Sequence, residues 1–210
     1  AYEIPKRDWS SDVCSSDLNT NTPPTANMSE PKRVIGGHQT KVEFNCGLYI
    51  DPKNGDIYSV NNDTLDTMTV FSREARGDVP PTREMETPHG TYGIAVYEED
   101  SELFLTVQHA ASVVVYPKYG EGKQKELRMI AGNKTGLADP HGVVVDAKNK
   151  MIYVVNYGNW AEYEPGKERG GGGGTGGLGR IPGSGKFFPP SITSYPLKTD
   201  GDVEIGRAHV

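Results

Sequence analysis

Apolar and polar positions along the chain follow a motif that occurs three times. In each copy a glycine is followed by a short apolar run, and an apolar–aromatic pair comes ten residues after that glycine. The runs occupy residues 47–51, 93–97 and 142–146, and the pairs occupy residues 57–58, 103–104 and 152–153. Turn-forming residues fill each interval, as in Asp51-Pro52-Lys53-Asn54-Gly55-Asp56. This pattern predicts a strand, a tight hairpin and a second strand in every copy.

Two further strands are predicted for each blade, except that the third copy lacks its outer strand. The third strands are predicted at residues 69–71, 113–116 and 192–195, and more polar fourth strands precede the next glycine at residues 33–35, 81–85 and 127–130. No helical periodicity of useful length is present in the sequence. Four strands in roughly 45 residues, repeated, are typical of the blades of a β-propeller. We therefore expect an all-β fold in which residues 33–203 form a partial β-propeller of about three four-stranded antiparallel blades.

The third copy carries the most specific motif, GLADPHGVVVD at residues 136–146 followed by MIYVVN at residues 151–156. This stretch resembles the NHL repeats of six-bladed propellers, and the resemblance extends over residues 31–203. It implies a ring that needs roughly 270 residues. The chain then corresponds to about half a ring, with one outer strand of a preceding blade at residues 31–35. Since half a ring leaves apolar flanks uncovered, we expect the chain to be poorly soluble or to associate.

The two ends of the chain are related at the level of DNA. Residues 12–18 (DVCSSDL) can be encoded by DNA whose reverse complement encodes IGRAHV, the sequence of residues 205–210. Such an inverted repeat resembles a short-read library adapter that was read once in each orientation. We interpret residues 1–18 and 204–210 as adapter-derived and exclude them from the fold, and we expect residues 19–32 to be a disordered linker. The true N-terminus is then missing, so the location of the protein is unknown and an exported location is possible.

The charge and composition of the chain argue against several classes of function. The 210 residues carry a formal net charge of −6, and an acidic balance argues against a nucleic-acid partner, which needs a basic footprint. No apolar run approaches the roughly 18 residues of a membrane span. We assign no cofactor and no metal.

A glycine-rich insertion at residues 160–190 separates the second and third strands of the third copy. Its end, Gly183-Ser184-Gly185-Lys186, is similar to a phosphate-binding loop. The spacing is wrong, because Gly179 lies six residues before Gly185 instead of five, and Phe187 stands where the loop needs Ser or Thr. We expect a flexible surface loop instead.

The candidate site lies where the long loops gather. In a propeller blade, the loops that join a fourth strand to the next first strand share a face with the loops that join second and third strands, and every long segment of this chain falls in these loops. His141 directly precedes the glycine of the third copy, and Tyr92 and Cys46 hold the same place in the other two copies. His109 and His89 lie on adjacent loops of this loop-bearing face.

Asn61 and Asn156 end second strands on the same face, where they either hold a ligand or serve as turn residues. The predicted ligand-binding residues are therefore His141, Tyr92, His109, Asn61 and Asn156, and no catalytic residue is assigned.

Two functions remain open at this point. The first is a binding scaffold that takes an unknown small molecule or protein on the loop-bearing face. The second is a hydrolase or lyase, lactonase-like or metal-dependent, in which His141 and His109 act at the mouth of the channel as metal ligands or as acid and base.

Overall fold

The computed structural model describes residues 17–18, 31–62, 64–161 and 186–205. These residues form strands and turns, with one 3-10 turn at His38–Thr40 and no α-helix in the described ranges. The all-β prediction is confirmed. Within the part of the chain that the structure describes, no helix is long and apolar enough to cross a membrane.

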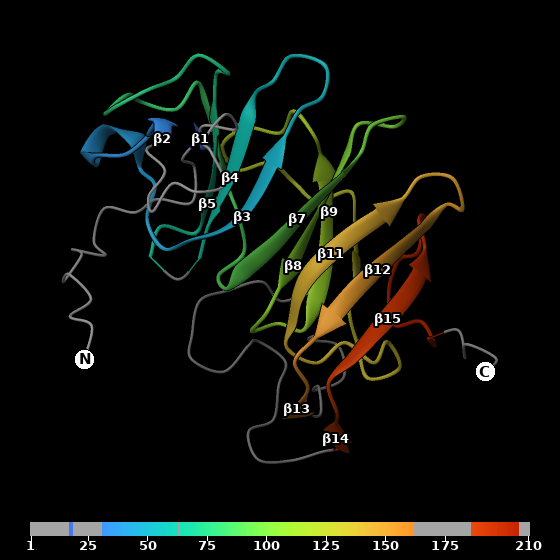
Figure 1. Cartoon of the computed structure of the whole chain (residues 1–210). Coiled ribbons are helices and arrows are strands. Elements are labelled where there is room, and N and C mark those ends of the chain that lie inside the picture. The colour runs from blue at the N-terminus through green and yellow to red at the C-terminus, as the bar shows by residue number, and fades with distance from the viewer. Residues whose placement is uncertain (1–16, 19–30, 63, 162–185, 206–210) are drawn as a thin grey trace, which may run out of the picture.

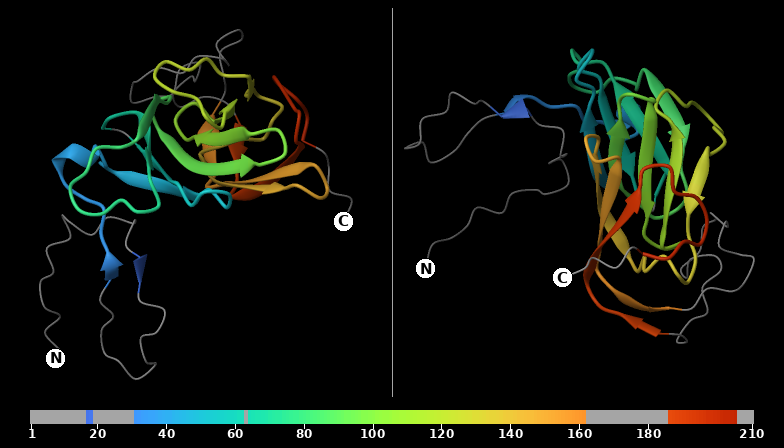
Figure 2. Two further views of the ribbon diagram at one scale, coloured as in Figure 1. Left: turned by 90° about the horizontal axis from the view of Figure 1, so that it is seen from above. Right: turned by 90° about the vertical axis from the view of Figure 1, so that its right-hand side faces the viewer.

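Three antiparallel sheets are arranged side by side as a fan (Figures 1 and 2). The first blade contains β3 (Asn45–Ile50), β4 (Ile57–Asn61), β5 (Thr67–Phe71) and β6 (Arg83–Glu86). The second contains β7 (Thr91–Tyr97), β8 (Glu102–Val107), β9 (Ser112–Pro117) and β10 (Arg128–Ile130). The third contains β11 (Pro140–Asp146), β12 (Met151–Asn156) and β15 (Ser191–Pro196). The predicted partial propeller of about three blades is confirmed, and the third blade has three strands in the described residues.

Two small ladders lie outside the blades. β1 (Asp17–Leu18) pairs with β2 (Pro31–Arg33), and β13 (Asn159–Ala161) pairs with β14 (Lys186–Phe188). The second ladder joins the two ends of the predicted glycine-rich insertion. The rest of that insertion, the predicted linker up to residue 30 and most of the ends predicted to be adapter-derived lie outside the described residues.

Each blade packs against the next through an apolar core. One core lies between the first and second blades and includes Tyr58, Met68, Leu105 and Val114, all almost fully buried. A second core between the second and third blades includes Phe104 and Ile152. The strands β8 and β9 are accordingly buried at every position except Pro117, whereas β12 alternates between buried and more exposed positions. The second blade is therefore covered on both faces and the third on one face.

Outer strands tie neighbouring blades together by a repeated backbone contact. Met85 in β6 forms a parallel bridge with Gly122 of the second blade, and Ile130 in β10 does the same with Gly201 of the third. Ile35, directly after β2, bridges to Gly77 of the first blade in the same way. All three glycines have positive φ, which a residue with a side chain adopts only at a cost. Ile35 thus makes the same kind of contact with the first blade that Met85 and Ile130 make with the blades that follow theirs.

Charged side chains join the blades on the turn-bearing face, opposite the long loops. Between the first and second blades, the Lys118 Nζ lies 2.7 Å from Asp51 Oδ2 and 2.6 Å from Glu98 Oε1, with the lysine side chain fully buried. Burial alone would raise the pKa of Glu98, but hydrogen bonds from Lys118 and Tyr49 lower that pKa to about 2. The pairing is needed because a buried charge without a partner is strongly destabilising.

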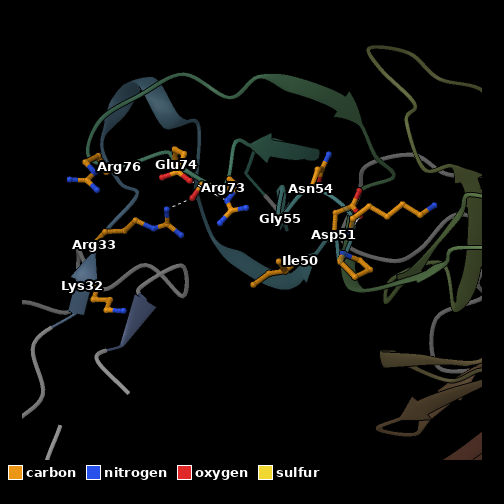
Figure 3. Close-up of a pocket in the computed structure, with 11 residues that line it drawn as sticks. Lys32, Arg33, Ile50, Asp51, Asn54, Gly55, Arg73, Glu74 and Arg76 are labelled. Atoms are coloured by element: carbon orange, nitrogen blue, oxygen red, sulfur yellow. Dashed lines mark hydrogen bonds and ion pairs between the residues drawn. The ribbon is translucent and has the colours of Figure 1, made fainter. Parts of the chain in front are cut away.

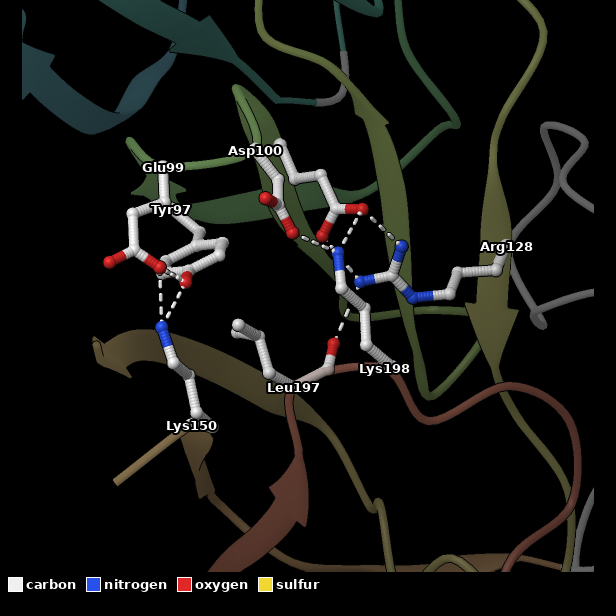
Figure 4. A network of polar contacts seen from close by, with 8 residues as sticks. Tyr97, Glu99, Asp100, Arg128, Lys150, Leu197 and Lys198 are labelled. Atoms are coloured by element: carbon white, nitrogen blue, oxygen red, sulfur yellow. Dashed lines mark hydrogen bonds and ion pairs between the residues drawn. The ribbon is translucent and has the colours of Figure 1, made fainter. Parts of the chain in front are cut away.

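The second and third blades meet in a similar network (Figure 4). Glu102 accepts hydrogen bonds from both terminal nitrogens of Arg128, at 2.9 and 2.7 Å, and lies 2.7 Å from the Lys198 Nζ. Lys150 and Lys198 of the third blade contact Glu99 and Asp100 of the second. At both junctions, lysines contributed by one blade pair with carboxylates of the blade before it.

The first strands of the second and third blades come together closely at Gly93. The Gly93 amide donates a 2.7 Å hydrogen bond to Thr106 Oγ1, and that hydroxyl donates in turn to the carbonyl oxygen of His141. A Cβ at Gly93 would overlap the same carbonyl oxygen. Glycine is therefore required here for the approach of one backbone to another, at an ordinary φ.

Gly93→Ala is expected to lower the free energy of unfolding by about 1–3 kcal/mol, because β11 must move away to admit the methyl group. Gly142→Ala is the matched control, since a Cβ at Gly142 would meet only Val155 atoms at 3.8 Å or more. It should change stability by less than about 0.5 kcal/mol. Urea unfolding followed by circular dichroism measures both variants. Equal stability of the two would contradict the close approach.

Candidate functional site

Three aromatic rings stack at the end of the third blade that carries the long loops. Tyr92 is the second residue of β7, His141 is the second residue of β11, and Tyr157 follows the end of β12. The His141 ring lies between the other two, with its centroid 3.9 Å from that of Tyr92 and 3.7 Å from that of Tyr157. We call Tyr92, His141 and Tyr157 the aromatic stack. The equal register of Tyr92 and His141 in the sequence thus corresponds to direct contact.

The His141 imidazole is enclosed but has no hydrogen bond to the described residues. Its side chain is 10% exposed, and neither Nδ1 nor Nε2 has a hydrogen-bond partner. The nearest charge is Asp139, whose Oδ1 lies 3.5 Å from Nε2. Burial lowers the pKa of His141, and the Asp139 carboxylate opposes this shift without reversing it. The ring is therefore neutral at pH 7, with one nitrogen able to donate and the other able to accept.

Cys46, the third residue at this register position, borders the aromatic stack. It is a partly exposed cysteine whose Sγ lies 3.6 Å from the Phe44 carbonyl oxygen. Burial raises the pKa of the Tyr92 phenol, and the neighbouring Cys46 and Tyr157 raise it further. Tyr92 is therefore a neutral donor or acceptor at physiological pH.

His109 belongs to a second cluster on the loop-bearing face. Its ring centroid lies 5.1 Å from that of His89, and His89 Nδ1 lies 3.1 Å from Asp66 Oδ1. The His109 Nδ1 is buried and makes no hydrogen bond among the described residues. A carboxylate beside one imidazole, with a second imidazole against it, can orient a proton-transferring histidine. Throughout the described residues, no group of three or more His, Cys, Asp or Glu side chains is arranged to hold a metal ion.

Asn61 and Asn156 are buried and use their amides within the protein. The Asn61 Oδ1 accepts from the Glu43 amide at 3.0 Å, and its Nδ2 donates to the Lys41 carbonyl and to Thr67 Oγ1. Asn156 repeats this arrangement, with its Oδ1 accepting from the Ala138 amide at 3.1 Å. Both asparagines fix the loop that leads into the first strand of their own blade.

Some of the buried polar atoms that lack a hydrogen-bond partner among the described residues lie on this face. Besides the two histidines, they include Asn62 Oδ1, Thr87 Oγ1 and Ser112 Oγ, all in or next to the loops that surround the clusters. Sequence reasoning selected His141, Tyr92 and His109, but it assigned no role to Tyr157, Asp139 or Asp66. The only signal for Tyr157 was its place directly after Asn156.

A separate cavity of about 660 Å³ opens beside the first blade, on the turn-bearing side (Figure 3). Its wall carries charges of both signs, including Lys53, Arg73, Arg76 and Glu74. The Arg33 guanidinium donates to the Arg73 carbonyl oxygen across one end. This cavity lies at the opposite end of the sheets from the aromatic stack.

A titration of His141, followed through the ¹⁵N shifts of its imidazole, is expected to give a pKa below 6.5. Because the unfolded chain then takes up this proton at a higher pH than the folded chain does, His141 does not affect stability above about pH 6.5. Stability is lost as the pH falls from there to the folded-state pKa. Asp139→Asn should lower the pKa further, since it removes the opposing carboxylate. A pKa at or above 6.5 in the folded chain would contradict the burial described above.

Comparison with known proteins indicates the fold and does not identify a family. No protein-family model and no curated protein matches the chain. Among solved structures, the chain is similar to Kuenenia stuttgartiensis hydrazine synthase, with a TM-score of 0.50, 12% identity, and coverage of 77% of this chain and 36% of that one. A nidogen/laminin complex gives a TM-score of 0.43 and 15% identity, with coverage of 74% and 45%. The chain spans less than half the length of either protein, and these likenesses concern the β-propeller fold alone.

Proposed function

We propose that the chain is part of an NHL-like six-bladed propeller that serves as a binding scaffold, with its ligand docked on the loop-bearing face. In this proposal residues 33–203 are the propeller part and residues 1–18 and 204–210 are adapter-derived. The repeated glycine, strand and hairpin pattern supports the NHL assignment, and the three stacked sheets agree with it. The ligand is a small molecule or a protein segment that reaches the ends of β7, β11 and β12.

One observation carries this proposal, namely the His141 ring held between Tyr92 and Tyr157, with no hydrogen bond to either nitrogen from the described residues and the Asp139 carboxylate 3.5 Å from Nε2. A buried imidazole that lacks hydrogen bonds costs free energy, which a ligand with a matching polar group would recover. Tyr157 is more than half exposed. Its exposed aromatic ring beside a neutral imidazole favours a flat ligand group that carries a hydrogen-bond donor or acceptor.

A fragment screen on the ¹⁵N-histidine-labelled 210-residue chain tests this proposal. Aromatic amides and aromatic carboxylates are the probes, and the imidazole shifts of His141 are the readout. We expect members of one class to bind with roughly millimolar affinity. His141→Ala and Tyr157→Ala should each weaken that binding about tenfold, because each removes one side of the stack.

His38→Ala is the matched control, since His38 is exposed and lies on another loop. It should leave fragment binding unchanged. The scaffold proposal fails if no probe shifts His141, or if the bound fragments are unaffected by both substitutions in the stack.

A hydrolase or lyase is the second candidate, and the cluster of Asp66, His89 and His109 favours it. Since Asp66 orients His89, and His89 packs against His109, this cluster can accept a proton from water or substrate. The chain is then expected to hydrolyse δ-valerolactone above the buffer rate. His109→Ala and Asp66→Asn should each lower that rate by at least tenfold, while His38→Ala should preserve it. Hydrolysis followed by pH-stat decides the matter, and a rate equal to that of buffer removes this candidate.

A further inference from the structure

We infer that two copies of this chain bind each other head to tail, with the free face of the third blade of one copy against the free face of the first blade of the other. This surface is separate from the loop-bearing face. The inference rests on the equivalence of positions in the three blades, which the strand registers establish. A side of a blade that is exposed at one end of the chain is therefore equivalent to a side that another blade covers inside the chain. The covered side shows which kind of surface the exposed side can contact.

The free face of the third blade carries four exposed apolar side chains. Ile192 is 71% exposed and Val144 is 63% exposed, and Tyr153 and Val155 are also exposed. Val144 pairs with Tyr153 and Val155 pairs with Ile192, so all four lie on one side of the sheet. The opposite side of the same strands is buried against the second blade.

These four positions are core positions in the other blades. By register, Tyr153 corresponds to Tyr58 in the first blade and to Phe104 in the second. Ile192 corresponds in the same way to Met68 and Val113. The first-blade residues lie in the core against the second blade, and the second-blade residues lie in the core against the third. The exposed face of the third blade thus has the composition of a face that covers a following blade.

The first blade exposes the complementary kind of face only along β3, because β4 and β5 are buried on both sides and Ile57 and Phe71 already pack against Ile35. Leu48 is 41% exposed and Ile50 is 57% exposed on β3. Their register equivalents in β7, Ile94 and Val96, pack against the core that joins the first and second blades. Leu48 and Ile50 therefore belong to the side that a preceding blade covers.

Charge selects the first blade of a second copy as the occupant. Inside the chain, Lys118 directly follows β9, the third strand of the second blade. It pairs with Asp51, which directly follows β3, the first strand of the first blade. Arg73 holds the place of Lys118 in the first blade, and Asp146 holds the place of Asp51 in the third. Within one chain, Arg73 pairs with its neighbour Glu74 at 3.1 Å, and the Asp146 carboxylate accepts hydrogen bonds from Asn149 of its own hairpin. A head-to-tail contact brings Arg73 of one copy to Asp146 of the other, and so repeats the pair found at the inner junction.

Sedimentation equilibrium of the full 210-residue chain tests this inference. We expect reversible, concentration-dependent association, as a closed dimer if the three blades cover half a ring and as longer head-to-tail assemblies if they do not. Ile192→Lys should raise the dissociation constant by at least tenfold, because it places a charge in the centre of the contact. Leu127→Lys is the matched control, since Leu127 is 53% exposed and lies outside both free faces. It should leave association unchanged.

A charge swap tests the orientation of the two copies. Asp146→Arg and Arg73→Asp should each weaken association about tenfold, because each places like charges at the junction. The double variant restores an opposite pair between copies, so its dissociation constant should return to within about threefold of the original. Arg73 is exposed and Asp146 is partly exposed, and circular dichroism of each variant is the check that it folds.

Three results would overturn the inference. The first is a chain that stays monomeric at 100 µM, which is roughly the range of weak specific association. The second is association that Ile192→Lys does not weaken. The third is a double charge variant that associates no better than its two parents, which would assign the free faces to a different occupant.

Discussion

The apolar faces that neighbouring blades press together determine where every other feature of this molecule lies. A sheet that is covered on both sides, as the second blade is, leaves only its ends and its outer edge for polar groups. The ends carry the charged network on one side and the loops on the other. The glycine at Gly93 allows the first strands to approach, and the bridges at Gly122 and Gly201 hold the outer edges. Packing between the blades thus fixes the positions of the strand ends that carry the residues of the site.

Because the blades repeat, equivalent residues at the start of their first strands lie close together on the loop-bearing face, although their side-chain chemistry differs. Cys46, Tyr92 and His141 hold the same register position, yet they are a thiol, a phenol and an imidazole. Mixed Cys and His sets can bind zinc, but a tyrosine holds the middle position, and among the described residues no three His, Cys, Asp or Glu side chains are arranged to hold a metal ion. The mixed set instead provides a thiol, one aromatic ring and a neutral hydrogen-bonding imidazole, a combination that agrees with the proposed binding site.

The strands could be predicted from the sequence because the hairpin repeat fixes both spacing and face. The third strand predicted at residues 69–71, for example, is β5 at Thr67–Phe71. His141 and Tyr92 followed from the same register. Tyr157 and Asp139 did not, because their positions depend on the path of loops whose backbone no periodicity describes. The buried Lys118 was equally hidden, since its partner Asp51 comes from another blade. For Asn61 and Asn156 the sequence located the residues but not their role, because a buried amide that fixes a loop has the same sequence signature as one that binds a ligand.

The head-to-tail contact and the loop-bearing face are connected through the same geometry. In such a contact both copies keep their loops on one side, because each junction repeats the relation between blades within a chain. Within a chain, Tyr92 at the start of β7 stacks on His141 at the start of the next first strand. Across the contact, the next blade after that of His141 is the first blade of the other copy, which carries Cys46 at the same register position. The side of His141's blade that is open in one chain is then lined by a second copy, and the mouth contains two aromatic stacks. A ligand that contacts both stacks would favour the associated form, because it binds that form better than the separate chains.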